Sequence, residues 1–246
     1  MALKIDLNYS PNFYSIKRNP KQIKFLIFHY TGMKKESDAI KKLTSIKSDV
    51  SSHYFIKNNG DIILMVPDLY IAWHAGKSSW KNYTSLNKNS IGIEISNPGH
   101  RNNYINFSKQ QIKSLVKLSK YLIHKYKIKK NCLLGHSDIA PDRKLDPGEK
   151  FPWKMLSKKG IGIWHNLNLI KLKSFRYKFV SNKESNLFVG KLKIFGYSNK
   201  SNIFHNSSKF NKLLVKAFQR RFRPELINGK IDHECLLILD NLLNIK

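Results

Sequence analysis

The sequence has few cysteines, no long apolar run and no recognisable export signal. Its two cysteines, Cys132 and Cys235, form no CxxC pair, so no disulfide scaffold is expected. The longest apolar stretches, such as 25–28 and 62–66, have the length of strands and are far too short to span a bilayer. Residues 1–12 lack the apolar segment of a signal peptide. We therefore expect no transmembrane segment, and the missing signal favours the cytoplasm.

Acidic residues are also scarce: 16 aspartates and glutamates stand against 45 lysines and arginines, which gives a net charge of +29. Such an excess can indicate an anionic partner, such as nucleic acid or a membrane surface. Only seven of the 45 are arginines, however, and the 38 lysines are scattered from Lys4 to Lys246. Bidentate phosphate recognition favours arginine over lysine. We interpret the charge as a compositional bias and expect no nucleic-acid partner; attraction to anionic cell-wall polymers or lipid headgroups stays open.

The chain has 246 residues, 41% of them hydrophobic, which is enough for a domain of about 150 residues and a small appendage. Apolar runs and turn signals predict mixed strands and helices in the first two-thirds. Ser108 and Gln111 form a capping box ahead of a helical repeat of apolar residues. In chain order we expect a strand at 23–28, a hairpin over 53–66, a strand at 91–95, a helix ending near Tyr126 and a strand at 132–135.

The pattern changes after about residue 156. Residues 157–180 mix lysine, glycine and asparagine with short apolar pieces, as in a connector. From Leu187 onward we expect two or three short helices, of which the last two lie at 212–221 and 233–244, separated by proline and glycine breakers. The C-terminal part is therefore predicted to be a small helical appendage.

Three side chains near predicted strand ends are candidates for a metal site. His29 closes one apolar strand, His136 follows another, and Asp146 lies ten residues further on in a polar loop. Two histidines and one carboxylate leave an open fourth position for water, as in catalytic zinc sites. A metal there would polarise a scissile carbonyl and lower the pKa of its bound water to about 7. Spacing alone leaves this open, because such sets also arise by chance.

Two charged residues are candidates for catalysis. Glu94 interrupts the apolar strand at 91–95, and burial would raise its pKa toward the range of a general base. An outward-facing position on the strand is the alternative. Lys144 stands two residues before Asp146, so both side chains would point the same way in an extended segment. A cation there would stabilise an oxyanion; one more exposed lysine is the alternative.

Five segments in order carry a resemblance to a known family: 28–32 (FHYTG), 52–56 (SHYFI), 72–76 (AWHAG), 90–94 (SIGIE) and 135–148 (GHSDIAPDRKLDPG). They resemble the zinc-dependent N-acetylmuramoyl-L-alanine amidases, a family that includes the peptidoglycan recognition proteins. The resemblance implies an α/β fold in which helices flank a mixed central β-sheet and Zn²⁺ lies in a groove at one sheet end. It implies hydrolysis of the amide between N-acetylmuramic acid, in its ordinary or 1,6-anhydro form, and L-alanine of the stem peptide, in cell-wall turnover or recycling.

The resemblance also implies roles for individual residues. His29, His136 and Asp146 match the zinc ligands, Glu94 matches the general base, and Lys144 matches the group that stabilises the tetrahedral intermediate. Three more residues are predicted to line the substrate groove, with simple packing as the alternative: Tyr30, Trp73 and His74. Since the ligand and base positions are intact, we expect an active enzyme that acts on peptidoglycan or a muropeptide. We also expect it to be a monomer. The alternative is a non-catalytic peptidoglycan-binding protein.

A second resemblance covers the C-terminal part. Residues 217–224 (AFQRRFRP) and 229–232 (GKID) resemble a small three-helix peptidoglycan-binding domain, which would favour the cell envelope over the cytoplasm. The alternative is an amphipathic cap packed on the catalytic domain, and the basic cluster 220–223 is equally consistent with a solvated face. The expected organisation is a catalytic domain over 10–157, a connector over 158–186 and a peptidoglycan-binding-like helical domain over 187–246.

Overall fold

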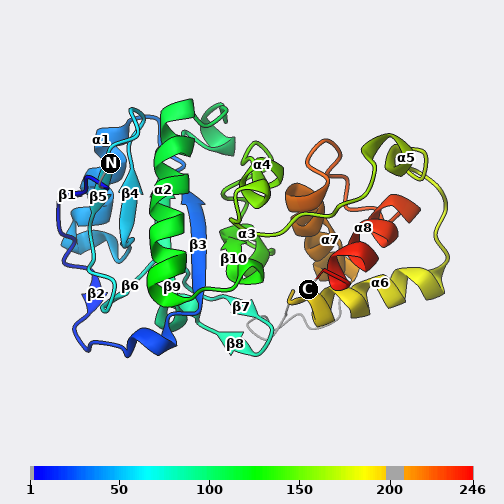
Figure 1. Ribbon diagram of the computed structural model, residues 1–246, viewed down its shortest axis with the longest axis horizontal. Coiled ribbons are helices and arrows are strands. Elements are labelled where there is room, and N and C mark those ends of the chain that lie inside the picture. The colour runs from blue at the N-terminus through cyan, green and yellow to red at the C-terminus, as the bar shows by residue number, and fades with distance from the viewer. Residues whose placement is uncertain (1–2, 198–207, 246) are drawn as a thin grey trace.

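A six-stranded mixed sheet forms the centre of the N-terminal two-thirds of the protein (Figure 1). The computed structural model describes residues 3–197 and 208–245. The strand order is β1-β5-β4-β9-β3-β10; β4 and β5 form the predicted antiparallel hairpin, and the other neighbours pair in parallel. The strand bounds are β1 Asp6–Leu7, β3 Phe25–Tyr30, β4 Tyr54–Ile56, β5 Ile62–Leu64, β9 Ser90–Ile95 and β10 Leu133–Gly135.

The central strands β3 and β9 are buried on both faces, which explains their nearly continuous apolar sequences. Side chains of β3 alternate between two hydrophobic clusters. Leu26 and Phe28 pack on the face that is covered by helix α2 (Lys109–Tyr126), whereas Phe25 and Ile27 share a cluster with the C-terminal helices. Each face of one strand therefore contacts a different part of the chain.

Helix α2 is one long, uninterrupted helix that covers one face of the sheet (Figure 1). Its predicted capping box is present, since the Ser108 hydroxyl accepts from the Gln111 N–H and the Gln111 side chain accepts from the Ser108 N–H. Leu115, Leu118 and Leu122 recur at helical spacing on its buried face. Short elements complete this part: α1 Glu36–Thr44, α3 His136–Ile139, α4 Trp153–Lys158, the strand pair β2 Phe13–Tyr14 with β6 Ile71–Ala72, and β7 Ser79–Trp80 with β8 Tyr83–Thr84.

Over the described part of the remaining chain, four helices follow: α5 Leu169–Lys173, α6 Asn182–Phe195, α7 Ser208–Phe222 and α8 His233–Leu243. Helices α7 and α8 confirm the two predicted at 212–221 and 233–244. Helix α6 begins at Asn182, five residues before the predicted start at Leu187. The start was missed because the capping box of Ser181 and Glu184 falls within a lysine-rich stretch that resembles a connector.

The C-terminal helices pack on the sheet domain through one continuous hydrophobic cluster. Phe218 and Phe222 of α7 belong to the same cluster as Ile27 of β3 and Leu134 of β10. The basic residues 220–223 are buried in this arrangement, so the interpretation of that cluster as a solvated face is wrong. The reason is that two of its arginines, Arg221 and Arg223, find buried hydrogen-bond acceptors, as described below.

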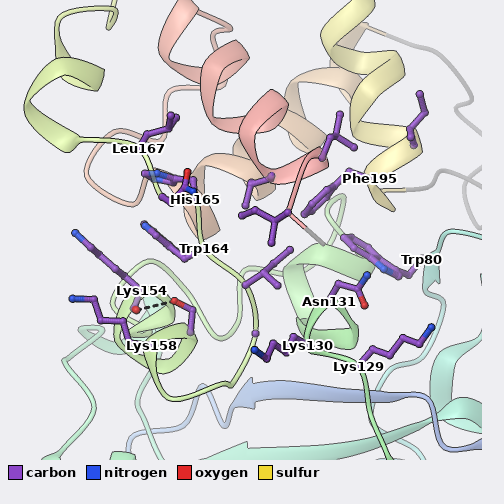
Figure 2. A pocket seen from close by; sticks show the side chains of 18 of the residues that line it. Trp80, Lys129, Lys130, Asn131, Lys154, Lys158, Trp164, His165, Leu167 and Phe195 are labelled. Carbon is purple, nitrogen blue, oxygen red and sulfur yellow. Dashed lines mark hydrogen bonds between the residues drawn. The ribbon is translucent and has the colours of Figure 1, made fainter.

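A cavity of 1040 Å³ lies beside this packed contact, between residues 129–131 and helix α4 on one side and the C-terminal helices on the other. Figure 2 shows Trp80, Trp164 and Phe195 on its walls, with Lys129 and Lys158 on the side of the sheet domain. The two parts of the chain thus meet at a hydrophobic core and, beside it, at a cavity.

Among the helices of the described residues, none has the length and apolar character needed to cross a bilayer.

Candidate metal centre

All eight residues that the sequence singled out line one pocket of 400 Å³ at the carboxyl ends of β3 and β9. They are His29, Tyr30, Trp73, His74, Glu94, His136, Lys144 and Asp146. The sheet explains how residues far apart in sequence meet here. His29 and Glu94 occupy paired positions of the parallel strands β3 and β9, and β10 on the other side of β3 leads directly into His136.

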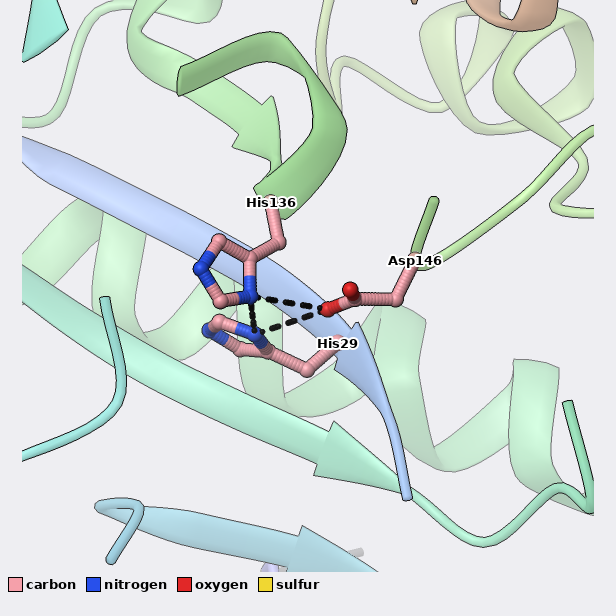
Figure 3. A group of neighbouring side chains, drawn as sticks. All are labelled: His29, His136 and Asp146. Carbon is pink, nitrogen blue, oxygen red and sulfur yellow. Dashed lines mark hydrogen bonds and ion pairs between the residues drawn. The ribbon is translucent and has the colours of Figure 1, made fainter. Parts of the chain in front are cut away.

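Two imidazole rings and one carboxylate converge at the bottom of this pocket. Figure 3 shows His29, His136 and Asp146 pointing toward one another from β3, from α3 and from the loop that follows it. The Nδ1 atoms of the two histidines are 2.9 Å apart, and each lies 3.0 Å from Oδ2 of Asp146. All three side chains are buried, and their ligand atoms face a common point.

The charge state of this group suits a cation. Burial, and then the neighbouring His136, lower the pKa of His29 to about 4, and burial likewise lowers the pKa of His136. Burial on its own would raise the pKa of Asp146, but the facing histidines outweigh it and hold the pKa below its ordinary value. Near neutral pH the group therefore consists of two neutral imidazoles and one carboxylate, with a net charge of −1.

The tautomer of His29 follows from a hydrogen-bond chain that ends at a backbone carbonyl. The Ser90 hydroxyl donates to the Leu86 carbonyl over 2.6 Å, so its oxygen accepts from Nε2 of His74 over 3.1 Å. Nδ1 of His74 is then an acceptor, and it receives the Nε2–H of His29 over 3.0 Å. The proton of His29 thus lies on the far side of the ring from Asp146, and Nδ1 presents a lone pair.

The same reasoning holds for His136. Its Nε2 lies 3.1 Å from the carbonyl oxygen of Ala75, which can only accept, and 3.4 Å from Nη2 of Arg143, so the shorter contact places the proton on Nε2. Both Nδ1 atoms and the Asp146 carboxylate are consequently acceptors that face one another with no proton between them. Three acceptors within 3.0 Å repel unless a cation lies among them, and nitrogen and carboxylate ligands suit zinc.

His74 lies behind the candidate metal ligands. It lines the pocket as predicted, but its ring is buried and both of its nitrogens are used in the chain from His29 to Ser90. Gly92 of β9 makes room for it, because a Cβ at that position would lie 2.5 Å from Cγ of His74. The ring is therefore placed to orient His29, a candidate metal ligand. The sequence did not predict this role, although the segment 90–94 (SIGIE), which contains Ser90 and Gly92, carried part of the family resemblance.

Glu94 faces the pocket beside His29. Within the described chain, its Oε2 atom is buried and has no hydrogen-bond partner. Burial, reinforced by the negative charge of Asp146, raises the pKa of Glu94 to about 8, and Lys144 opposes the shift. The predicted outward-facing alternative is therefore wrong, and a carboxyl group with this pKa is suited to accept and return a proton near neutral pH.

The other predicted residues form the walls of the pocket. Lys144 lies in the loop between the ligands His136 and Asp146. The Tyr30 hydroxyl is 2.8 Å from Nδ1 of His100, and His100 in turn pairs with Glu149; neither partner was predicted from the sequence. Burial raises the pKa of Tyr30 to about 12, so the phenol stays protonated. Trp73 also lines the pocket. Its backbone N–H donates to the Ser51 hydroxyl, and its ring packs against the ring of Tyr14.

Known proteins are similar to this chain in sequence and fold. Residues 19–149 match the family model described as N-acetylmuramoyl-L-alanine amidase. The chain belongs to this family. It is 35% identical over 234 residues to N-acetylmuramoyl-L-alanine amidase AmiD of Escherichia coli, a match that covers 90% of this chain and 83% of that protein.

Two solved structures are similar to this amidase along most of its length. One is E. coli AmiD in complex with the substrate anhydro-N-acetylmuramic acid-L-Ala-D-γ-Glu-L-Lys, with a TM-score of 0.79 at 33% identity, covering 90% of this chain and 89% of that one. The other is AmpDh3 of Pseudomonas aeruginosa, with a TM-score of 0.78 at 30% identity and 98% coverage of both chains. The predicted family, mixed-sheet fold and amidase activity are thus confirmed.

Proposed function

We propose that this amidase uses zinc bound by His29, His136 and Asp146 to hydrolyse the amide between N-acetylmuramic acid and L-alanine. The convergence of three acceptor atoms with no proton among them carries this proposal. Zinc in such a site supplies Lewis-acid chemistry toward the scissile carbonyl and the attacking water. The alternative, a non-catalytic peptidoglycan-binding protein, has no need of an unpartnered carboxyl group with a raised pKa beside the metal ligands.

Glu94 is the proposed proton carrier. Its carboxylate takes a proton from the attacking water as the new C–O bond forms. It then returns that proton to the L-alanine nitrogen as the C–N bond breaks, so that the products are the free lactyl carboxylate and the stem peptide. The Lys144 ammonium group, on the loop between two ligands, opposes the negative charge that develops on the carbonyl oxygen.

The substrate we propose is a muropeptide, including the 1,6-anhydro form. Support comes from the relatives, since E. coli AmiD is similar along 90% of this chain and binds an anhydro-muramoyl tripeptide in its solved complex. AmpDh3 was likewise solved with an anhydromuramic pentapeptide. Tyr30 and Trp73 are the proposed contacts to the sugar or peptide, because both line the pocket.

For the organisation of the protein, our prediction remains a monomer with a catalytic part and a peptidoglycan-binding-like part.

The test is hydrolysis of an anhydro-muramoyl tripeptide by the purified protein, read by mass spectrometry. We expect release of a free peptide that begins with L-alanine, its loss after treatment with a zinc chelator, and its recovery when zinc is added. Binding of the muropeptide without cleavage, with zinc present, would support the non-catalytic alternative and overturn the proposal.

A further inference from the structure

Arg221 of helix α7 reaches out of the C-terminal helices into the sheet domain. Its Nη1 donates to Oδ2 of Asp138 over 2.6 Å, and its Nη2 donates to the Leu133 carbonyl over 2.9 Å. The guanidinium lies over the Trp153 ring at 4.2 Å. Only 3% of Arg221 is exposed. An arginine so deeply buried needs acceptors, and all of those named here belong to the sheet domain.

The two acceptors of Arg221 flank a metal ligand. Leu133 begins strand β10, and Asp138 lies in α3, which starts with His136. Arg221 therefore holds residues on both sides of His136 with one planar group. Bidentate contacts of this kind fix orientation as well as position.

Asp138 is held from other sides too. The Gly135 N–H donates to its Oδ2 over 2.8 Å, and the hydroxyl of Tyr197, two residues after the end of α6, donates to its Oδ1 over 2.7 Å. Asp138 is 1% exposed, so these contacts replace water around the carboxylate. Two of its three donor groups, those of Arg221 and Tyr197, come from the C-terminal part of the chain.

Helix α3 has only four residues, a length that is not stable as an isolated helix. Its geometry, and with it the direction of the His136 ring, depends on contacts made from outside. On the opposite side of the ring, Nε2 lies 3.1 Å from the Ala75 carbonyl and 3.4 Å from Nη2 of Arg143. Groups that orient the backbone next to a metal ligand act on metal affinity as outer-shell hydrogen bonds do.

We propose that Arg221 and Tyr197 are positioning residues for the metal centre, and that the C-terminal helices complete this centre rather than only carrying a separate binding function. The inference rests on the proposed metal site of His29, His136 and Asp146. It requires that loss of the Arg221 or Tyr197 contact weakens metal binding by the intact chain, beyond any effect on folding.

The chain offers a matched control in Arg223, two residues further on. Arg223 is 1% exposed and donates to Asp232 over 2.6 Å and to Glu234 over 3.2 Å, both in the C-terminal part. Replacing either arginine with methionine removes the charged partner of a buried carboxylate, Asp138 for Arg221 and Asp232 for Arg223, and lowers stability. Only the Arg221 contact touches the segment that carries His136. A purely structural role for Arg221 predicts the same outcome for the two variants.

The experiment measures the zinc dissociation constant of the full-length wild type, R221M, R223M and Y197F by competition with a chromophoric chelator. Circular dichroism sets a temperature at which all are folded. We expect the affinity of R221M to fall by roughly 10- to 100-fold and that of Y197F to fall less, while R223M keeps the wild-type affinity. If R221M does not fold, Y197F, which loses a single hydroxyl, provides the test.

The outcomes separate the two proposals. Unchanged zinc affinity in R221M, or in Y197F where only that variant folds, overturns the positioning role, as does an equal loss in R221M and R223M. Absence of zinc binding by the wild type would instead overturn the proposed metal centre itself.

Discussion

His29 and Glu94 are paired residues of the neighbouring parallel strands β3 and β9, so the hydrogen bonds of the sheet hold a proposed metal ligand and a carboxyl group side by side. Neither position depends on a loop. The site thereby combines two groups placed by the rigid sheet with others, such as His136, Lys144 and Asp146, that are brought in by the segment after β10.

The first prediction concerns Glu94. Replacing it with glutamine keeps the size of the side chain but removes its ability to take up a proton. We expect kcat on an anhydro-muropeptide to fall by roughly 10²- to 10⁴-fold while the zinc content stays at the wild-type level. Glu36→Gln on α1 is the control and should retain full activity, because this half-buried side chain does not line the pocket. Wild-type turnover in E94Q would contradict the assignment of the base.

The raised pKa of Glu94 also predicts a pH dependence of stability in the metal-free protein. Its carboxyl pKa is about 8 in the fold against an ordinary value of 4.5. The folded state holds this proton more tightly, so the group stabilises the fold at low pH, and the contribution is lost as pH rises through 8. Melting curves of metal-free wild type and E94Q from pH 5 to 9 should diverge in favour of E94Q. A constant difference in Tm across this range would count against the buried, protonated state.

The chain from His29 through His74 to Ser90 predicts graded effects on metal affinity. His74→Phe keeps a ring of similar size but removes the acceptor for the His29 N–H. We expect its zinc affinity to fall by roughly 10- to 100-fold, and that of Ser90→Ala to fall less. His165→Phe, a buried histidine away from the ligands, is the control. Equal zinc affinity in H74F and H165F would show that the chain does not orient His29.

Gly92 and Gly190 form a matched pair of glycine-to-alanine substitutions. A Cβ at Gly92 would lie 2.5 Å from the His74 ring, whereas a Cβ at Gly190 in α6 meets nothing within 4 Å. We expect G92A to lower the free energy of unfolding by about 1–3 kcal/mol and to weaken zinc binding. G190A should raise stability by about 0.5–1 kcal/mol, since alanine favours a helix interior. Denaturant titration of both variants checks the pair, and a neutral G92A would refute the steric argument.

The sequence was sufficient for the elements whose pattern is continuous. The apolar runs of β3 and β9 predicted buried strands, and the capping box at Ser108 marked the start of α2. Strands of two residues, such as β1 and β2, have no readable period, because two residues cannot establish alternation. The long segment at 135–148 predicted His136 and Asp146 as ligands by resemblance, which spacing alone could not do.

Contacts between distant residues were outside the reach of pattern analysis. His74 meets His29 across 45 positions, and Arg221 meets Asp138 across 83, so neither pair has a local signature. Burial of an arginine cluster is also unexpected from composition, since arginine is usually exposed. It became explicable only once the buried carboxylates that receive these arginines were in place.

The most direct test of the central claim is a zinc titration of the metal-free protein, with release of the L-alanine peptide followed at each step. We predict no hydrolysis before zinc is added, a rise in rate in proportion to the metal, and a plateau at one zinc per chain. Hydrolysis by the metal-free protein, or no hydrolysis at any ratio of zinc to protein, would contradict a catalytic zinc centre formed by His29, His136 and Asp146.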